Sequence, residues 1–117
     1  MVGHIIAVLR QSRIVKSLEV LELVEEESVQ FLRARAEIAD GSVLHVRELF
    51  TSTHSKYSYH WQDLTGETRL RWDNAPHHPE IPTHPDHKHE SGQVSPSNRV
   101  SIEEVLAELE ARLPRRK

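Results

Sequence analysis

Hydrophobic residues near the N-terminus recur at the spacing of one face of a helix. Ile5, Val8 and Leu9 fall on the same side, which predicts a short helix over residues 2–12. The apolar residues of the next segment, 15–25, fit both the alternation of a strand and the period of a helix. Its β-branched residues favour a strand.

Apolar and polar residues alternate on both sides of the next turn, which is the pattern of a β-hairpin. A three-residue loop of Asp40, Gly41 and Ser42 would gather the apolar side chains on one face. The predicted pairs are Ile38 with Leu44, Ala36 with Val46, and Leu32 with Phe50. This register turns Glu48 towards the apolar face, opposite Ala34. Glu48 then either reaches water at a rim or is a recessed general base.

A second hairpin is predicted around the turn Leu64-Thr65-Gly66. In the register that this loop favours, Tyr59 and Trp61 share a face with Arg69 and Arg71. Aromatic rings beside arginines bind unstacked bases and phosphates. The same pairs also stabilise a sheet without any ligand. A register shifted by one residue would instead move the aromatic rings into the core.

The C-terminal segment has the pattern of a capped helix. Ser101 and Glu104 form a capping box, Pro114 ends the apolar periodicity, and the pattern predicts a helix over residues 101–113. Its apolar stripe consists of Ile102, Val105, Leu106, Leu109 and Leu113. The basic residues that suit the negative end of this helix are Arg112, Arg115, Arg116 and Lys117. Together the elements predict an α+β fold, with four to five antiparallel strands in a meander and an N-terminal and a C-terminal helix on one face.

Composition narrows the classes of protein to consider. The 117 residues are the length of one domain, and we expect residues 1–117 to form a single domain. The net charge of -3 excludes a global basic field, so a nucleic-acid site has to be a local patch. The absence of cysteine excludes disulfides, thiolate metal sites and cysteine nucleophiles. No apolar run is long enough for a membrane span or a signal sequence, so we expect a cytoplasmic protein without membrane contacts.

Histidine is the unusual residue, with nine in the chain. Five of them lie among prolines in one stretch, and we predict a proline-stiffened loop over residues 75–98. These histidines are His77, His78, His84, His87 and His89. Imidazole is a common metal ligand, and Asp73 or Asp86 could complete a metal site. Alternatively, imidazoles and cations could carry out acid–base cleavage of RNA. A solvated loop without function stays open as a third interpretation.

A resemblance to a known family rests on two linked motifs. The segment 57–63, YSYHWQD, is followed by RWDNAPHH over residues 71–78 and then by the histidines of residues 85–89. This order resembles the TumE family of prokaryotic type II toxin–antitoxin toxins, over roughly residues 29–89. The resemblance implies a small toxin that its antitoxin neutralises by direct binding. It assigns no chemical role to any residue.

The leading hypothesis is a toxin that acts on cellular RNA as an endoribonuclease, without a metal ion or cofactor. Its expected partners are a cognate antitoxin and RNA, and a homodimer is left open. The candidate catalytic residues are Glu48, His60, His77, His78, His87 and His89. The candidate substrate-binding residues are Tyr59, Trp61, Arg69, Arg71 and Lys88. The alternatives are a metal-dependent hydrolase or nuclease with a His/Asp site, and a non-enzymatic module that binds a partner.

Overall fold

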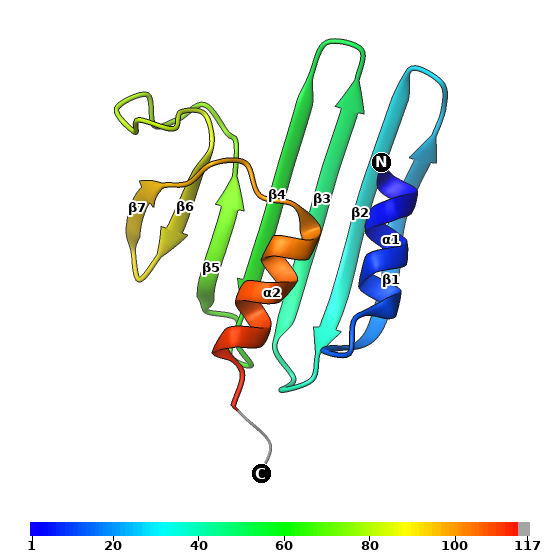
Figure 1. Ribbon diagram of the computed structural model, residues 1–117, viewed down its shortest axis with the longest axis vertical. Coiled ribbons are helices and arrows are strands. Elements are labelled where there is room, and N and C mark those ends of the chain that lie inside the picture. Colours follow the sequence, from blue (N-terminus) through cyan, green and yellow to red (C-terminus); the bar gives the residue numbers. More distant parts are fainter. Residues whose placement is uncertain (115–117) are drawn as a thin grey trace.

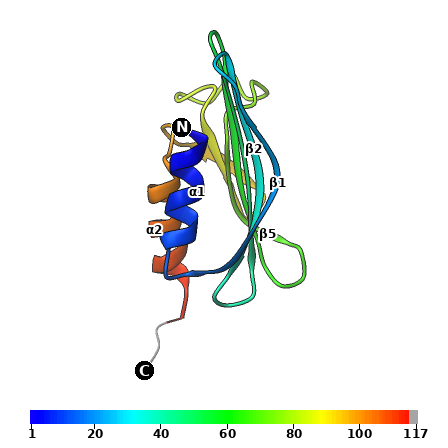
Figure 2. The ribbon, with the colours of Figure 1, turned by 90° about the vertical axis from the view of Figure 1, so that its right-hand side faces the viewer.

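The computed structural model describes residues 1–114, which form an antiparallel sheet of seven strands with two helices on one face (Figures 1 and 2). In chain order the elements are α1 (Val2–Gln11), β1 (Val15–Glu25), β2 (Val29–Ile38), β3 (Val43–Thr51), β4 (Ser55–Gln62), β5 (Thr68–Asp73), β6 (His87–Glu90), β7 (Gln93–Pro96) and α2 (Ile102–Arg112). Each strand pairs with the one before it, so the sheet is a meander. The predicted α+β class and both predicted helices are confirmed, but the sheet has seven strands and not the predicted four to five.

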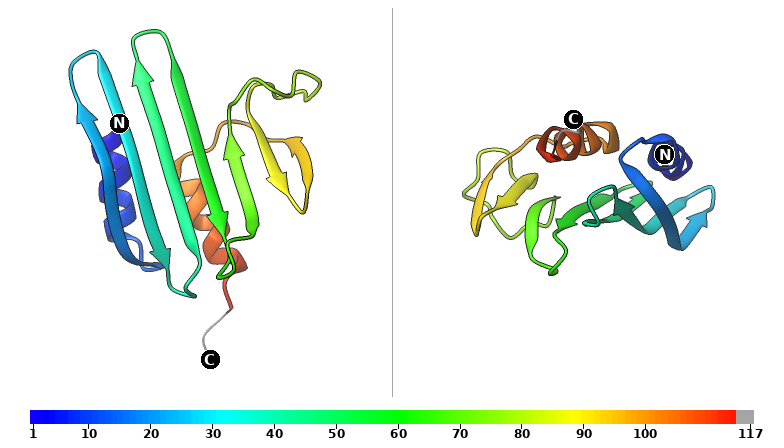
Figure 3. Two further views of the ribbon diagram at one scale, coloured as in Figure 1. Left: turned by 180° about the vertical axis from the view of Figure 1, so that it is seen from behind. Right: turned by 90° about the horizontal axis from the view of Figure 1, so that it is seen from below.

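The sheet has an inner face, covered by α1 and α2, and an outer face that points away from them (Figure 3). The core lies between the inner face and these helices, where apolar residues from β2 to β5 meet Ile5, Leu9 and Leu109. The predicted capping box is confirmed, because Ser101 and Glu104 cap α2 reciprocally. Arg115, Arg116 and Lys117 lie outside the described residues. Among residues 1–114, no helix is long and apolar enough to span a membrane.

The ambiguous segment after α1 is strand β1, as its β-branched residues indicated.

The hairpin of β2 and β3 gathers its apolar side chains on one face, as predicted, but the predicted pairs are wrong by two residues. Ala36 lies opposite Leu44, and Leu32 lies opposite Glu48. The loop begins one residue earlier than predicted, because the Asp40 carboxylate accepts a hydrogen bond from the Ser42 amide at 3.0 Å. Since a shift of two residues keeps every side chain on its face, Glu48 still points inward.

The predicted register of β4 and β5 is wrong by one residue. Tyr59 lies opposite Trp72, and Trp61 lies opposite Leu70. The rings of Tyr59 and Trp61 are therefore buried on the inner face, and the expected face of aromatic rings with Arg71 does not form. Burying these large rings under the helices stabilises the fold more than exposed contacts with arginines would, because each buried ring removes a large apolar area from water. The shift moves Arg71 to the outer face, opposite His60.

The segment predicted as an uninterrupted loop over residues 75–98 contains β6 and β7. Its prolines occupy positions up to Pro85 and then stop until Pro96, so the backbone amides between them are free to pair. Ser91 and Gly92 make the turn with positive φ values of 53° and 73°. Strand β6 pairs with β5, so that His89 lies opposite Arg71 and His87 lies opposite Asp73. This pairing brings the histidines of the loop segment onto the sheet.

Candidate functional site

A row of basic side chains crosses the outer face of the sheet. Strand pairing places Arg35 opposite His45, His45 opposite His60, His60 opposite Arg71, and Arg71 opposite His89. We call these five residues the basic row. Histidines separate the two arginines of the row, and Arg35 also lies opposite Glu19 of β1. The charge of Arg71, with imidazoles on both sides of it, offers a place where an anion could bind.

Two imidazoles of the basic row are held in their neutral form. Partial burial lowers the pKa of His60 below its ordinary value, and the neighbouring charges of Arg71 and His45 lower it further. Partial burial also lowers the pKa of His89, an effect that Asp73 opposes and that His87 reinforces. Near neutral pH each ring therefore has a free lone pair, which can accept a proton or bind a metal ion.

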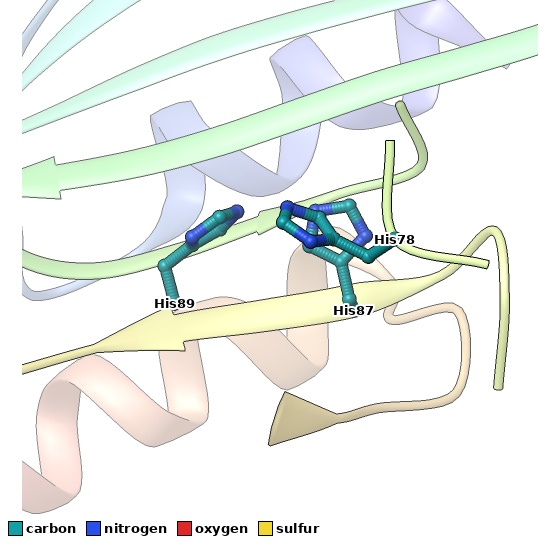
Figure 4. Close-up of side chains that lie close together, drawn as sticks. All are labelled: His78, His87 and His89. Carbon is teal, nitrogen blue, oxygen red and sulfur yellow. The ribbon is translucent and has the colours of Figure 1, made fainter. Parts of the chain in front are cut away.

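Three histidines meet at one end of the basic row (Figure 4). His87 and His89 project from the same face of β6, and His78 reaches them from the segment between β5 and β6. One ring nitrogen of each residue lies within 4.8 Å of those of the other two. The ring centroids are 4.8 Å apart for His87 and His89, and 5.0 Å apart for His78 and His87. We call these three residues the histidine cluster.

Asp73 is the buried acid beside the histidine cluster. Its Oδ1 lies 3.0 Å from Nε2 of His87 and accepts a hydrogen bond from the Ala75 amide. Its Oδ2 lies 3.0 Å from Nε of Arg71 and 3.5 Å from Nε2 of His89. Within residues 1–114, the buried Nε of Arg71 has no properly aligned hydrogen-bond partner. Asp73 therefore positions both the arginine and the imidazoles, while the half-exposed guanidinium of Arg71 can still bind an anion.

The other candidate catalytic residues are not part of this arrangement. Glu48 is buried on the inner face, where it accepts hydrogen bonds from the Tyr59 hydroxyl at 2.5 Å and from Arg99 at 3.0 Å. A cavity of about 380 Å³ adjoins this pair, between the N-terminal ends of α1 and α2. The sheet separates Glu48 from the histidines. His77 is exposed and lies outside the histidine cluster.

The candidate substrate-binding residues also divide between the two faces. Trp61 donates a hydrogen bond from Nε1 to the Ser42 hydroxyl at 2.8 Å, on the buried side with Tyr59. The guanidinium of Arg69 lies 4.8 Å from the centre of the Trp61 ring and pairs with Asp40. Lys88 alternates with the cluster histidines along β6 and lies opposite Trp72, so it belongs to the inner face. Of the candidate substrate-binding residues, Arg71 lies beside His60 and His89 on the outer face.

Sequence reasoning left three residues out of the candidate sets. Arg35 and His45 alternate with inward apolar residues, and this parity alone places them on the outer face. The sequence points to Asp73 only as a possible metal ligand, and its position beside the catalytic candidates depends on the pairing with His87. The position of Asp73 two residues after Arg71 was the signal that could have found it, since both share one face of a strand.

The arrangement permits two kinds of chemistry. His60 and His89 flank Arg71 on neighbouring strands, which are about 4.8 Å apart in any sheet. A phosphate held by Arg71 would therefore lie between two imidazoles, as proton transfer at a phosphodiester requires. The histidine cluster, in contrast, presents three nitrogens to one point, which suits a transition-metal ion.

The chain was compared with protein families, curated proteins and solved structures. Residues 5–113 match the family model described as "Toxin TumE". The search of curated proteins gave no match, and neither did the search of solved structures.

Proposed function

The chain belongs to the TumE toxin family, and from this premise we propose that it is the toxin of a type II toxin–antitoxin pair and cleaves cellular RNA. In this proposal it acts in the cytoplasm as an endoribonuclease, without a metal ion or cofactor, until its cognate antitoxin inactivates it by direct binding. The observation that carries the proposal is the placement of Arg71 between His60 and His89 on the outer face.

The proposed cleavage is an internal transfer at the scissile phosphate. Arg71 binds the phosphate and stabilises the negative charge that develops on it. His60, held neutral by partial burial and by its cationic neighbours, takes the proton of the ribose 2′-hydroxyl as its oxygen attacks phosphorus. Burial keeps the pKa of His89 low in the free protein, but the negative charge of a bound phosphate, together with Asp73, favours the protonated form, which gives its proton to the departing 5′-oxygen. The products are a 2′,3′-cyclic phosphate and a 5′-hydroxyl.

Further arginines extend the positive charge of the outer face beyond the proposed centre. Arg35 continues the basic row onto β2, and Arg47 lies in the adjacent row, opposite an Arg33 that pairs with Glu22 at 2.8 Å. Such a surface suits a phosphate backbone, which carries a negative charge at each nucleotide. The net charge of -3 does not argue against such binding, because part of the negative charge is concentrated in the three glutamates of residues 25–27, at the turn between β1 and β2.

We expect Arg71→Gln to weaken RNA binding for all sequences alike, because phosphate contacts carry no sequence information. The slope of log affinity against log salt should decrease by about one. The measurement is a salt series of binding isotherms with a non-cleavable RNA. Arg10→Gln is the matched control, because it removes the same charge from an exposed position on α1. Equal effects of the two substitutions would contradict binding on the outer face.

The toxin hypothesis itself is tested by inducible expression in a bacterial host, with and without the gene next to the one encoding this chain. We expect growth arrest, RNA fragments ending in 2′,3′-cyclic phosphate, and rescue by the neighbouring gene product. The His60→Ala variant should cause neither arrest nor fragments at equal protein levels. Growth arrest with intact RNA would instead favour the non-enzymatic partner-binding module.

A further inference from the structure

The hydrogen bonding of His87 leaves one of its ring nitrogens without a suitable partner. Its Nδ1 lies 2.8 Å from the carbonyl oxygen of Pro85, and a carbonyl can only accept, so Nδ1 carries a hydrogen. In the neutral ring Nε2 then presents a lone pair. This lone pair lies 3.0 Å from Oδ1 of Asp73, which is also an acceptor when ionised. Two lone pairs at this distance repel each other, and either a proton or a metal ion at Nε2 would remove the repulsion.

The surroundings of His87 provide further nitrogen ligands for a metal ion. His78 and His89 bring their ring nitrogens within 4.8 Å of that of His87. His87 is buried, whereas His78 and His89 are half-buried. The bond from Nδ1 of His87 to a backbone carbonyl is also the outer contact that usually orients a metal-binding imidazole.

We infer that His78, His87 and His89 form a binding site for a divalent transition-metal ion of the zinc class, with Asp73 supplying negative charge beside it. Neutral imidazoles prefer zinc, copper and nickel to magnesium or calcium. In a tetrahedral zinc site with Zn–N distances of about 2.0–2.1 Å, the nitrogens lie about 3.4 Å apart. Small rotations of His78 and His89 would therefore close the site, and a fourth position stays open for water or for an Asp73 oxygen.

One consequence of the metal site rests on the proposed function. His89 belongs to the histidine cluster and also to the basic row. An ion that binds its lone pair prevents His89 from carrying a proton, so zinc should inhibit the proposed cleavage. The ion would also tie the segment between β5 and β6 to β6 through His78. The site itself does not depend on whether the protein cleaves RNA.

The direct test is a titration of Zn²⁺ into the tag-free, chelator-treated full chain, followed by isothermal calorimetry. We expect saturable binding of one ion per chain. His78→Ala should weaken it by at least about tenfold. His84→Ala is the matched control, because this exposed histidine belongs to the same segment but not to the histidine cluster. Absence of saturable binding, or equal weakening by the two substitutions, would overturn the site.

Two further measurements keep the test decisive. Circular dichroism melts without metal show whether His78→Ala is folded, and His87→Gln provides a second variant with a polar side chain in the buried position. RNA cleavage is then measured with zinc and with chelator. Inhibition by zinc that the chelator reverses supports the shared role of His89, and unchanged cleavage at saturating zinc contradicts it. If cleavage requires zinc, the site stands and the metal-free mechanism of the proposed function is wrong.

Discussion

Replacing His60 with alanine is expected to reduce RNA cleavage by about 10²–10⁴-fold, which is the usual contribution of a general acid or base. His60 lies opposite Arg71 on the outer face, and its lowered pKa keeps the ring able to accept a proton near neutral pH. Its side chain is only half-buried, and its Nε2 contact with the Thr68 hydroxyl at 2.6 Å is at the surface. The substitution should therefore remove the chemistry and leave the fold intact.

The measurement is single-turnover cleavage of an end-labelled RNA in the presence of chelator, alongside a thermal melt of each variant. His84→Ala is the control, because it removes an exposed imidazole outside the basic row. His89→Ala should show a loss of similar size, and the double variant should lose little more than either single variant, because groups that act as a unit are not additive. If His60→Ala cleaves as fast as the unchanged protein, His60 is not the general base, and the proposed cleavage centre is wrong.

The alternation of residues along β2 and β3 was sufficient to predict which side chains point inward, including Glu48. It was not sufficient for the register, because apolar residues two positions apart are equivalent on one face. The exact pairing depends on where the turn begins. The side chain of Asp40 decides this by bonding the Ser42 amide and pairing with Arg69 from β5. A contact that comes from a third strand cannot be inferred from the hairpin's own residues.

For β4 and β5, the sequence offered two chemically reasonable registers. One register exposes Tyr59 and Trp61 beside arginines, and the other buries them. The choice follows from what covers the sheet, and α1 and α2 cover the inner face (Figure 2). Because this packing involves both ends of the chain, the pattern within residues 57–72 cannot reveal it.

The histidine cluster could be predicted only in part. His87 and His89 are two residues apart, so their sharing of a face follows from any extended backbone. The partnership with His78 depends on the path of the segment between β5 and β6, which the prolines shape without making it periodic. Asp73 and Arg71 lie beside the histidine cluster only because β6 pairs with β5. The prolines of this stretch predict a loop, so the short strand β6 could not be predicted from its composition.

The second large effect is expected from Trp61→Ala, which should lower the free energy of unfolding by about 3–5 kcal/mol. Trp61 is 1 % exposed, between Leu44 and Leu70 on the neighbouring strands. Alanine would leave a cavity where the ring packs and would also remove the donor that bonds the Ser42 hydroxyl. The expected loss is a large part of the total stability of a small domain.

Thermal and urea unfolding of the variant provide the measurement, with Leu64→Ala as the control. Leu64 is a large apolar residue in the turn after β4 and is 74 % exposed, so its truncation should change stability by less than about 0.5 kcal/mol. Trp61→Phe should fall between the two, because it keeps much of the ring volume but loses the hydrogen bond. The opposite result would be a stable Trp61→Ala variant that has lost affinity for single-stranded RNA alone. In that case Trp61 stacks on a base, and the register that places it on the inner face is wrong.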